Sequence, residues 1–350
     1  MPRPRHAALP VLLALVPAIV LARPGSGGGK EVPAVPAAPR RTVAVTVDDL
    51  PFVGHGLPIA AVRTLSHDLV AALAERKVKA VAFVNEDKLL VPGEVDARIA
   101  LLEGWLDAGM ELGNHAFGHP GLTKTPLAAM EDAVVRGDAV TRTLLARRGQ
   151  APRWFRHPFA QTGTSRETRD AFEAFLASRG YAVAPFTIEH EDWVFASADA
   201  KLRADGDEAA RAKLLAAYLD DFDARLAFYE ERSRALFGRE IPQVLLTHAN
   251  ALNARAMPLL LERLERRGYV FVTLDEAHAD PAWKSPDGYF GPWGPSWLHR
   301  FAAGRGEDVK ALFRAEPEAP KWVADLDAAR AASAATPAPA PTAPPASRIP

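Results

Sequence analysis

Two pairs of residues in this sequence have types and spacings suited to metal chemistry. Asp48 and Asp49 are adjacent carboxylates that end an apolar run, and His115 and His119 are separated by three residues. That separation lets two imidazoles bind one metal ion, on a helix or in a tight loop. Two imidazoles and one carboxylate suit zinc or a similar first-row ion and leave positions open for water and substrate. With Asp49 as the carboxylate ligand, Asp48 is free to act on the water.

Further polar residues lie where predicted strands end. Arg156, Asp192 and His248 each lie at or just beyond the end of such a strand. The carboxyl ends of parallel strands meet at one rim of a barrel, and barrel enzymes place their catalytic groups there. An Asp pair or a His pair taken alone is more often structural. Because polar residues recur at five separate strand ends, we expect them to gather around a single ion.

The elements that must position these residues follow from the pattern of apolar residues. Residues 42–49 are rich in valine and threonine without polar alternation, which is typical of a strand buried on both faces. Further strands are predicted at residues 78–84, 110–114, 153–156, 181–188, 243–247 and 269–274. Helices are predicted between them at residues 58–76, 94–108, 126–148, 165–178, 207–236 and 254–267. This alternation predicts a parallel sheet closed or nearly closed into a barrel, with a doubly wound open sheet as the alternative.

The first strand sets a condition on its two aspartates. Adjacent strand residues point to opposite faces, so Asp48 and Asp49 can share one ligand only where the strand frays into a loop. Pro51 has no N–H for a ladder and therefore predicts that fraying. At the end of the second strand, we interpret Asn85 as a helix cap, with contact to substrate as the alternative.

Five short motifs, in this order, resemble those of the NodB-type polysaccharide deacetylases, a carbohydrate esterase family. They are Thr46-Val47-Asp48-Asp49, His115-Ala116-Phe117-Gly118-His119, Arg156-His157-Pro158-Phe159, Asp192-Trp193 and Leu246-Thr247-His248. Residues 267–274 also resemble the last strand of that family. The resemblance implies an α/β fold, a distorted (β/α)7 barrel of parallel strands. It also implies hydrolytic removal of acetyl groups from a carbohydrate, with N-acetyl groups expected and O-acetyl groups as the alternative.

The same resemblance implies roles at the reacting centre. Asp49, His115 and His119 would hold one divalent metal ion, which we expect to be Zn²⁺, with Co²⁺ or Ni²⁺ as alternatives. Asp48 would be the general base that takes a proton from the activated water. His248 would be the general acid that protonates the leaving amine.

Other matching residues would surround that centre. Arg156 would orient the general base, and Asp192 would hold Arg156 in turn. Phe159 would offer its backbone N–H to the oxyanion, and Leu246 would help to form the small pocket for the acetyl methyl group. Trp193 would contact the substrate.

Composition divides the chain into segments. Arg3 and Arg5 precede an apolar run that ends in small residues, which predicts a signal peptide. The predicted segments are a signal peptide at 1–22, a linker at 23–41, the deacetylase barrel at 42–280, an aromatic-rich C-terminal extension packed on the barrel at 281–330, and a disordered Ala/Pro-rich tail at 331–350. We therefore expect an exported protein, periplasmic or secreted, without a stable membrane span after cleavage. An uncleaved anchor is the alternative.

Charge and cysteine content limit the binding partners and the metal ligands that we expect. The net charge is -1 and no long basic cluster interrupts the mixed charges, so we expect no nucleic-acid partner. The chain has no cysteine, so a metal site must use histidines and carboxylates.

Two other functions are open on the sequence alone. One is a non-catalytic glycan-binding barrel, although such a protein would need neither the base Asp48 nor the acid His248. The other is a metal amidohydrolase that acts on a small amide. Aromatic residues of the C-terminal extension weigh mildly against a small amide, because their flat faces suit sugar rings, but they equally suit covering the outside of the barrel.

Overall fold

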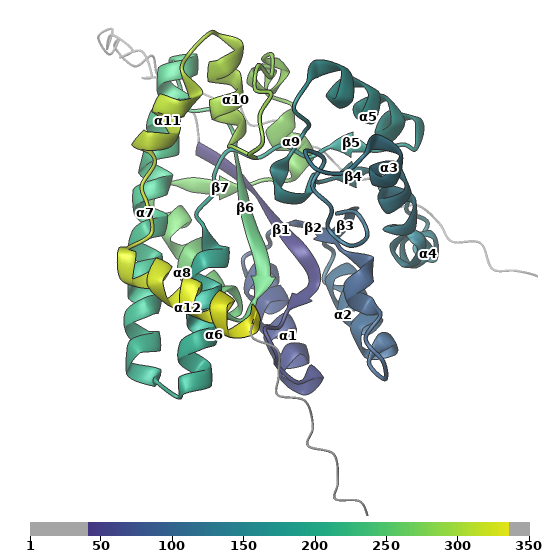
Figure 1. Ribbon diagram of the computed structural model, residues 1–350, viewed down its shortest axis with the longest axis vertical. Helices are drawn as coiled ribbons and strands as arrows, with labels where there is room; N and C mark the ends of the chain where they lie inside the picture. The colour runs from purple at the N-terminus through teal and green to yellow at the C-terminus, as the bar shows by residue number, and fades with distance from the viewer. Residues whose placement is uncertain (1–40, 336–350) are drawn as a thin grey trace, which may run out of the picture. The chain divides into compact units, whose positions relative to one another are not determined.

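The computed structural model describes residues 41–335, and these residues are arranged around one long central strand, β1 (Arg41–Val53) (Figure 1). Its valines and small residues are buried on both faces. Residues 43–48 are all buried, although successive side chains of a strand point to opposite faces. The unbroken apolar run therefore marks a strand covered from two sides, as the sequence predicts.

All strands of the sheet are parallel, and their order is β5-β4-β3-β2-β1-β6, with β7 paired to the start of β1. Their bounds are Val81–Val84 (β2), Glu111–Asn114 (β3), Trp154–Phe155 (β4), Ala182–Val183 (β5), Gln243–Asn250 (β6) and Tyr269–Phe271 (β7). A further parallel bridge joins Ile188, in the segment after β5, to Leu245 of β6. This bridge connects the two edges of the curled sheet, so the predicted distorted (β/α)7 barrel is confirmed.

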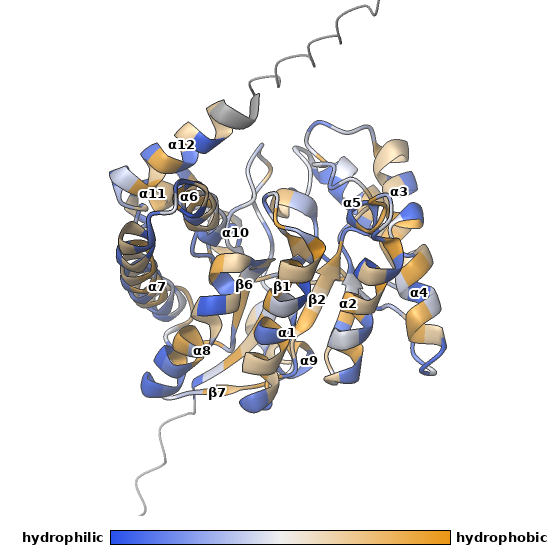
Figure 2. Ribbon diagram, turned by 90° about the horizontal axis from the view of Figure 1, so that it is seen from below, coloured by the Kyte–Doolittle hydropathy of each residue, from blue (hydrophilic) through white to orange (hydrophobic). Residues whose placement is uncertain are grey.

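Helices surround the strands, and their more hydrophobic sides face the sheet (Figure 2). They are Ile59–Glu75 (α1), Val95–Asp107 (α2), Leu127–Arg136 (α3), Ala139–Ala146 (α4), Arg166–Ser178 (α5), Asp192–Asp205 (α6), Glu208–Phe237 (α7), Ala251–Arg266 (α8) and Leu274–His278 (α9). Short 3-10 turns occupy Glu86–Leu89 (η1), Pro158–Ala160 (η2) and Pro281–Lys284 (η3).

Two helical segments differ from the prediction. The helix predicted over residues 126–148 is broken into α3 and α4 around Gly137, where an added Cβ would lie 2.8 Å from the backbone nitrogen of Phe117. The break thus lets the backbone approach the loop that carries His119. Helix α6 was not predicted. Most of its residues are buried, and it packs against α7, α8 and α12, so it lacks the one-sided apolar stripe that reveals a surface helix.

The C-terminal part of the described chain adds three helices, Trp297–Gly304 (α10), Val309–Ala315 (α11) and Lys321–Ala335 (α12). α10 packs against α7, and α12 packs against α6. α12 continues to Ala335, although the tail was predicted to begin at residue 331. The predicted signal peptide and nearly all of the predicted linker lie outside the described residues. Within residues 41–335, no helix is both long enough and apolar enough to cross a bilayer.

Candidate active site

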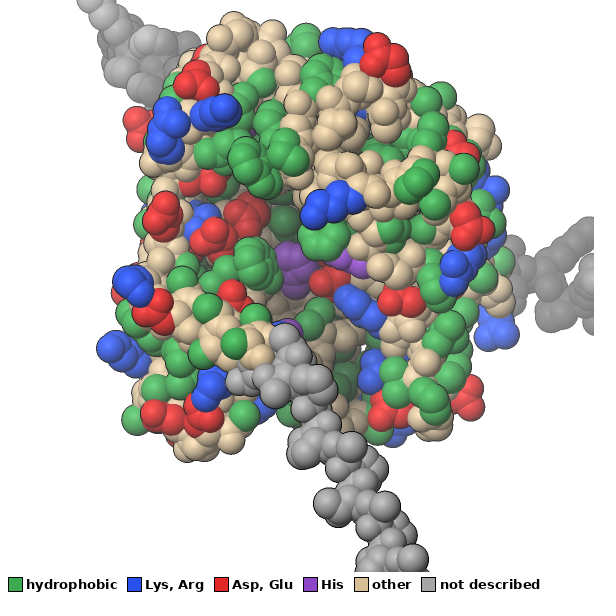
Figure 3. All heavy atoms as spheres, in the orientation of Figure 1, with side chains coloured by type: hydrophobic (Ala, Val, Ile, Leu, Met, Phe, Trp, Pro, Cys, Tyr) green, Lys and Arg blue, Asp and Glu red, His purple; other side chains and the backbone are tan. Residues whose placement is uncertain are grey.

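The carboxyl ends of the strands enclose a pocket of about 380 Å³. In the space-filling view, histidine and acidic side chains lie in a hollow bordered by hydrophobic side chains (Figure 3). Of the residues that the sequence assigns to the site, the pocket is lined by Asp48, Asp49, His115, His119, Arg156, Phe159, Trp193, Leu246 and His248. Asp192 does not line the pocket and lies behind His248. The structure therefore brings together residues that are up to 200 positions apart in the chain.

A local change in backbone direction lets both aspartates face this pocket. Asp49 has a φ of 71°, in the left-handed region, and the pairing of β1 with β6 shifts register between Asp48 and Val53. The expectation that the strand ends before Pro51 is wrong, because β1 continues to Val53. One left-handed residue within the strand, rather than a frayed end, reverses the usual alternation of side chains.

Asp49, His115 and His119 form a group able to hold a metal ion, since their ligand atoms all lie within 4.8 Å of one another. The Asp49 Oδ1 atom is 4.0 Å from Nε2 of His115 and 3.8 Å from Nε2 of His119. Burial lowers the pKa of both histidines, which keeps their rings neutral and able to donate a lone pair. Two neutral imidazoles and one carboxylate fit a first-row divalent ion.

Contacts behind His115 set the orientation of its ring. Its Nδ1–H donates to the carbonyl oxygen of Arg156 over 2.8 Å, so Nε2 faces the aspartates. The side-chain amide of Asn85 donates to the carbonyl oxygens of His115 (2.7 Å) and Ala116 (3.1 Å). Asn85 occupies the N-cap position of η1, as interpreted from the sequence, but its side chain makes no capping hydrogen bond there. It instead fixes the loop that carries both histidines.

Asp48 is buried beside a buried guanidinium. Its Oδ2 lies 3.8 Å from Nη1 of Arg156 and 3.7 Å from Nε2 of His115. Arg156 is held in place by a 2.9 Å hydrogen bond from Nη2 to the hydroxyl of Thr46. Burial raises the pKa of Asp48 to about 6, although the positive charges of Arg156 and His248 act in the opposite direction. A carboxylate with such a pKa can accept a proton near neutral pH.

His248 lies across the pocket and is bound to Asp192. The ring Nδ1–H donates to Oδ1 of Asp192 over 2.6 Å, and the backbone N–H of His248 donates to Oδ2 over 2.7 Å. Burial disfavours the charged ring, but the charge and hydrogen bond of Asp192 outweigh it and raise the pKa of His248 to about 10. Since Asp192 occupies Nδ1, the proton available to a ligand is on Nε2.

The role expected for Asp192 as the partner of Arg156 is wrong. Asp192 accepts hydrogen bonds from Thr247 Oγ1 over 3.1 Å and from the side-chain amide of Asn253, as well as those from His248. Asn253 was not singled out from the sequence. It lies in the first turn of α8, five residues after His248. Polar residues are common in the first turn of a helix, so this contact could not be predicted from the sequence.

Three apolar side chains also line the pocket, and two of them are largely exposed. Phe159 and Trp193 are 60% and 53% exposed, whereas Leu246 is buried. Phe159 has a φ of 54°, and its ring packs edge-on against His119 with a centroid distance of 4.4 Å. Gly294 of the C-terminal extension also lines the pocket, which the sequence did not indicate.

Two basic residues beyond the motifs contact the site or its loops. The Nζ atom of Lys88 in η1 lies 2.8 Å from Asp49 Oδ1. Burial disfavours ionisation of Asp49, but Lys88 and the nearby histidines overcome this effect and hold the pKa of Asp49 below its usual range. Arg300 of α10 is fully buried and donates to the carbonyl oxygen of Ala160 over 2.5 Å, beside Phe159.

The protein is thus a parallel α/β barrel with a group able to hold a metal ion at the carboxyl ends of its strands. Residues 36–176 match the model of the polysaccharide deacetylase family. For this part of the chain, the match confirms the resemblance drawn from the motifs. The match includes the first three motifs, whereas Asp192 and His248 lie beyond it.

Several solved structures are similar to the chain at low identity. A CE4 family pseudoenzyme from Bacillus anthracis is 16% identical, over 68% of this chain and 66% of its own, with a TM-score of 0.45. A family 4 carbohydrate esterase from Streptomyces lividans, in complex with acetate, is 20% identical over 68% and 95%, with a TM-score of 0.43. The peptidoglycan deacetylase PdaC from Bacillus subtilis is 19% identical over 69% and 93%, with a TM-score of 0.44. Among curated proteins, none matches the sequence significantly.

Proposed function

We propose that this protein is a metal-dependent hydrolase that removes N-acetyl groups from a carbohydrate. The match of residues 36–176 to the polysaccharide deacetylase model supports a hydrolase acting on acetyl groups. The observation that supports metal-dependent catalysis is that five side chains face one pocket: Asp48 with a raised pKa, His248 with a raised pKa, and three side chains able to ligate a metal ion. A non-catalytic glycan-binding barrel would need neither the base nor the acid.

Asp49, His115 and His119 would hold the metal through one carboxylate oxygen and two Nε2 atoms. When bound, a divalent ion such as zinc polarises a carbonyl and lowers the pKa of water from ~16 to about 7. The carbonyl of Arg156 and the amide of Asn85 keep the histidine loop in the orientation that this binding requires.

Proton transfer would be divided between the two sides of the pocket. Asp48 takes a proton from the attacking water, whose oxygen forms the new bond to the acetyl carbon. His248 donates its Nε2 proton to the nitrogen as the C–N bond breaks, so that acetate and a free amine leave. Asp192 keeps His248 protonated, and the guanidinium of Arg156 lies 3.8 Å from the Asp48 carboxylate.

The remaining residues would position the acetyl group. The backbone N–H of Phe159 is proposed to donate to the developing oxyanion, and one such donor typically contributes about 3 kcal/mol. Leu246 offers a buried apolar wall for the methyl group. Trp193 and the Phe159 ring are exposed at the pocket and are proposed to contact the sugar.

Acetate release from N-acetylglucosamine oligomers tests this proposal. The Asp48→Asn variant is expected to lose activity by a factor of about 10² to 10⁴, the usual contribution of a general base. Asp68→Asn, an exposed aspartate on α1, is the matched control and is expected to retain activity. Acetate release that survives Asp48→Asn would reject the assignment of the base, and release from small amides alone would favour the amidohydrolase alternative.

We further propose that the protein is exported to the periplasm or secreted, on the basis of the arginines and apolar run at residues 1–22. Amino-terminal sequencing of the protein from its native host is expected to give a mature end near Arg23. A mature chain that retains Met1 would favour the uncleaved anchor.

A further inference from the structure

Exposed aromatic side chains are concentrated near the pocket. Among the described residues, the large aromatics that are mostly exposed are Phe159, Trp193 and Trp293. Phe159 and Trp193 line the catalytic pocket, and Trp293 directly precedes Gly294, which also lines it. Exposed apolar side chains that gather at one place on a surface, rather than being scattered, mark a binding site.

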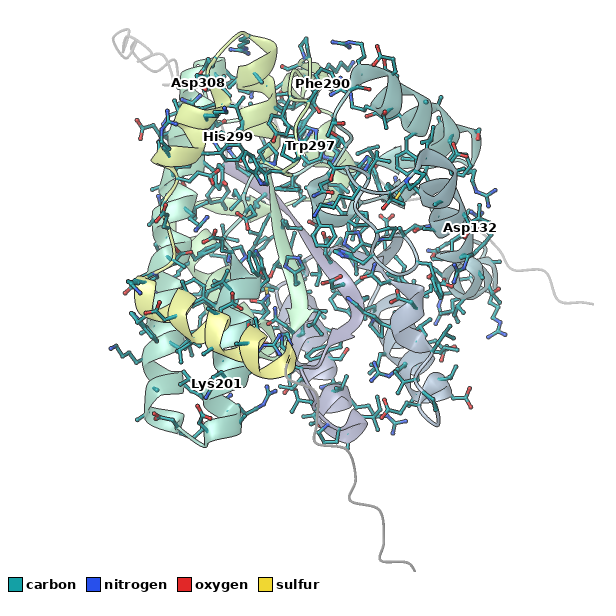
Figure 4. All side chains as sticks on the ribbon, in the orientation of Figure 1. Asp132, Lys201, Phe290, Trp297, His299 and Asp308 are labelled. Atoms are coloured by element: carbon teal, nitrogen blue, oxygen red, sulfur yellow. The ribbon has the colours of Figure 1, made fainter. Side chains whose placement is uncertain are left out.

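Trp293 also lines a second pocket, of about 410 Å³, formed within the C-terminal extension. Three other aromatic rings contribute to it, those of Tyr289, Phe290 and Phe313, together with Asp308 and Lys310. Figure 4 marks Phe290 and Asp308, which reach this pocket from two different segments of the extension. The Trp293 ring meets the Phe313 ring edge to face, at 5.9 Å and 82°, and 60% of Trp293 remains exposed.

The residues on both sides of Trp293 are attached to the loop of the third motif. The carbonyl oxygen of Pro292 accepts a 3.0 Å hydrogen bond from the side chain of Gln161. A Cβ added at Gly294 would lie 1.9 Å from the carbonyl oxygen of Phe159, so only glycine allows this close approach. The position of Trp293 is therefore fixed relative to the catalytic pocket.

We propose that Trp293 and the aromatic pocket beside it form a second sugar-binding subsite. It holds a pyranose unit of the same glycan whose acetylated unit enters the catalytic pocket. This inference rests on the proposed deacetylase function. The subsite makes the enzyme selective for polymeric substrates over short ones.

The chemistry of the second pocket matches a pyranose. The C–H faces of a sugar ring pack on flat aromatic side chains, and the rigid aromatic rings lose little conformational entropy on binding. Sugar hydroxyls need hydrogen-bonding groups at the edge of the ring, and Asp308 and Lys310 supply an acceptor and a donor. Trp293 and Gly294 are adjacent in the chain and line the two pockets, which favours a more distant unit of the same glycan over an unrelated ligand.

Chain-length dependence tests the subsite. For the wild-type protein, kcat/KM for acetate release is measured with the N-acetylglucosamine dimer and hexamer, and the same ratio is measured for Trp293→Ala. We expect the ratio of hexamer to dimer to fall about tenfold, mainly through KM, which corresponds to one lost aromatic contact. Trp293→Phe is expected to restore most of the ratio. Val270→Ala, an exposed residue of β7 that lines neither pocket, should leave it unchanged.

Binding without turnover separates this inference from the proposed function. Calorimetry measures hexamer binding to two proteins, the single variant Asp48→Asn and the double variant Asp48→Asn/Trp293→Ala. We expect the double variant to bind about tenfold more weakly. If wild-type protein releases no acetate from either oligomer, the proposed deacetylation fails, and the binding comparison still decides on the subsite. A length ratio unchanged by Trp293→Ala, or hexamer binding that is absent or equal in both variants, would overturn the subsite.

Discussion

On the side of the pocket that carries the candidate metal ligands, called the metal side below, Asp49, His119 and Phe159 have φ values of 71°, 52° and 54°. On the opposite side, His248 lies within the regular strand β6. Four of the eight non-glycine residues with positive φ among the described residues line this pocket: Asp49, His119, Phe159 and Ala160. Side chains on the metal side are thus aimed by unusual backbone conformations. His248 is instead aimed and charged by one side chain, that of Asp192.

This difference shows which properties depend on which residues. Left-handed backbone costs free energy at non-glycine positions and persists only where the surrounding structure imposes it. Replacements on the metal side should therefore reduce metal binding, because they disturb the geometry of the ligands. Replacements on the side of His248 should act on the protonation of one ring, and their effect should appear in the dependence on pH.

The largest effect is expected from the metal side. His115→Gln removes a buried ligand whose ring is already oriented by the carbonyl of Arg156. We expect the variant to bind metal poorly and to lose about 4 kcal/mol or more of transition-state stabilisation, about a thousandfold in rate. Metal analysis of the purified variant, together with acetate release, checks this. His67→Gln, a largely exposed histidine of α1, is the control, and an active, metal-loaded His115→Gln variant would contradict the assignment.

A smaller effect with a distinct signature is expected from Asp192→Asn. The folded-state pKa of His248 is raised to about 10, so its acid form is present at lower pH and is lost as pH rises through that value. Without the charge of Asp192, burial lowers that pKa, and the alkaline limb of kcat/KM should move to lower pH. We also expect a loss of about a hundredfold at neutral pH.

Thr247→Val serves as the comparison for that variant. It removes the 3.1 Å hydrogen bond that the Thr247 hydroxyl donates to Asp192 and the 2.7 Å hydrogen bond that it accepts from Asn253, but it keeps the charge of Asp192. Its pH profile should stay close to that of the wild type. An alkaline limb that Asp192→Asn does not move would mean that His248 is not the group that donates the proton.

An intermediate loss of activity is expected when Arg300 of the C-terminal extension is replaced. Arg300 is buried and donates to Thr162 Oγ1 (2.7 Å) and Asp287 Oδ2 (3.1 Å) as well as to Ala160. Arg300→Met would remove these three hydrogen bonds, although Asp287 would keep Arg169 as a charge partner at 3.0 Å. We expect a loss of about 3 kcal/mol in the free energy of unfolding. Acetate release should fall about tenfold while bound metal is retained, because the loop at Phe159 loses its support. Arg300→Lys should recover part of both losses, and a variant with wild-type stability and activity would show that the contact is dispensable.

The smallest effect is expected from replacing Lys88, which should strengthen metal binding and not weaken it. The ammonium group lies 2.8 Å from the same oxygen of Asp49 that faces both histidines, so it competes with a divalent cation. Lys88→Met should bind zinc about threefold to fivefold more tightly, as expected for the loss of a partly exposed ion pair. Lys88→Arg should behave like the wild type in calorimetric titration. Weaker binding by Lys88→Met would mean that Lys88 instead supports Asp49 as a ligand.

The sequence predicted the strands and the residues at their ends, because parallel strands bring their carboxyl ends to one rim whatever the intervening helices do. It did not predict the contacts of Asp192, Lys88 or Arg300. The Lys88 contact depends on where η1 lies beside β1, and the other two depend on how helices α6, α8 and α10 pack, over sequence separations of up to 140 residues. Helix α6 itself was missed because burial on several sides removes the amphipathic pattern.

Zinc titration of metal-free protein, with bound metal and acetate release measured on the same samples, tests the central claim most directly. We predict that activity rises in proportion to bound zinc, reaches its maximum at one equivalent per chain, and does not appear in His115→Gln at the same concentrations. Acetate release by metal-free protein, or a rate that does not follow bound metal, would contradict the account.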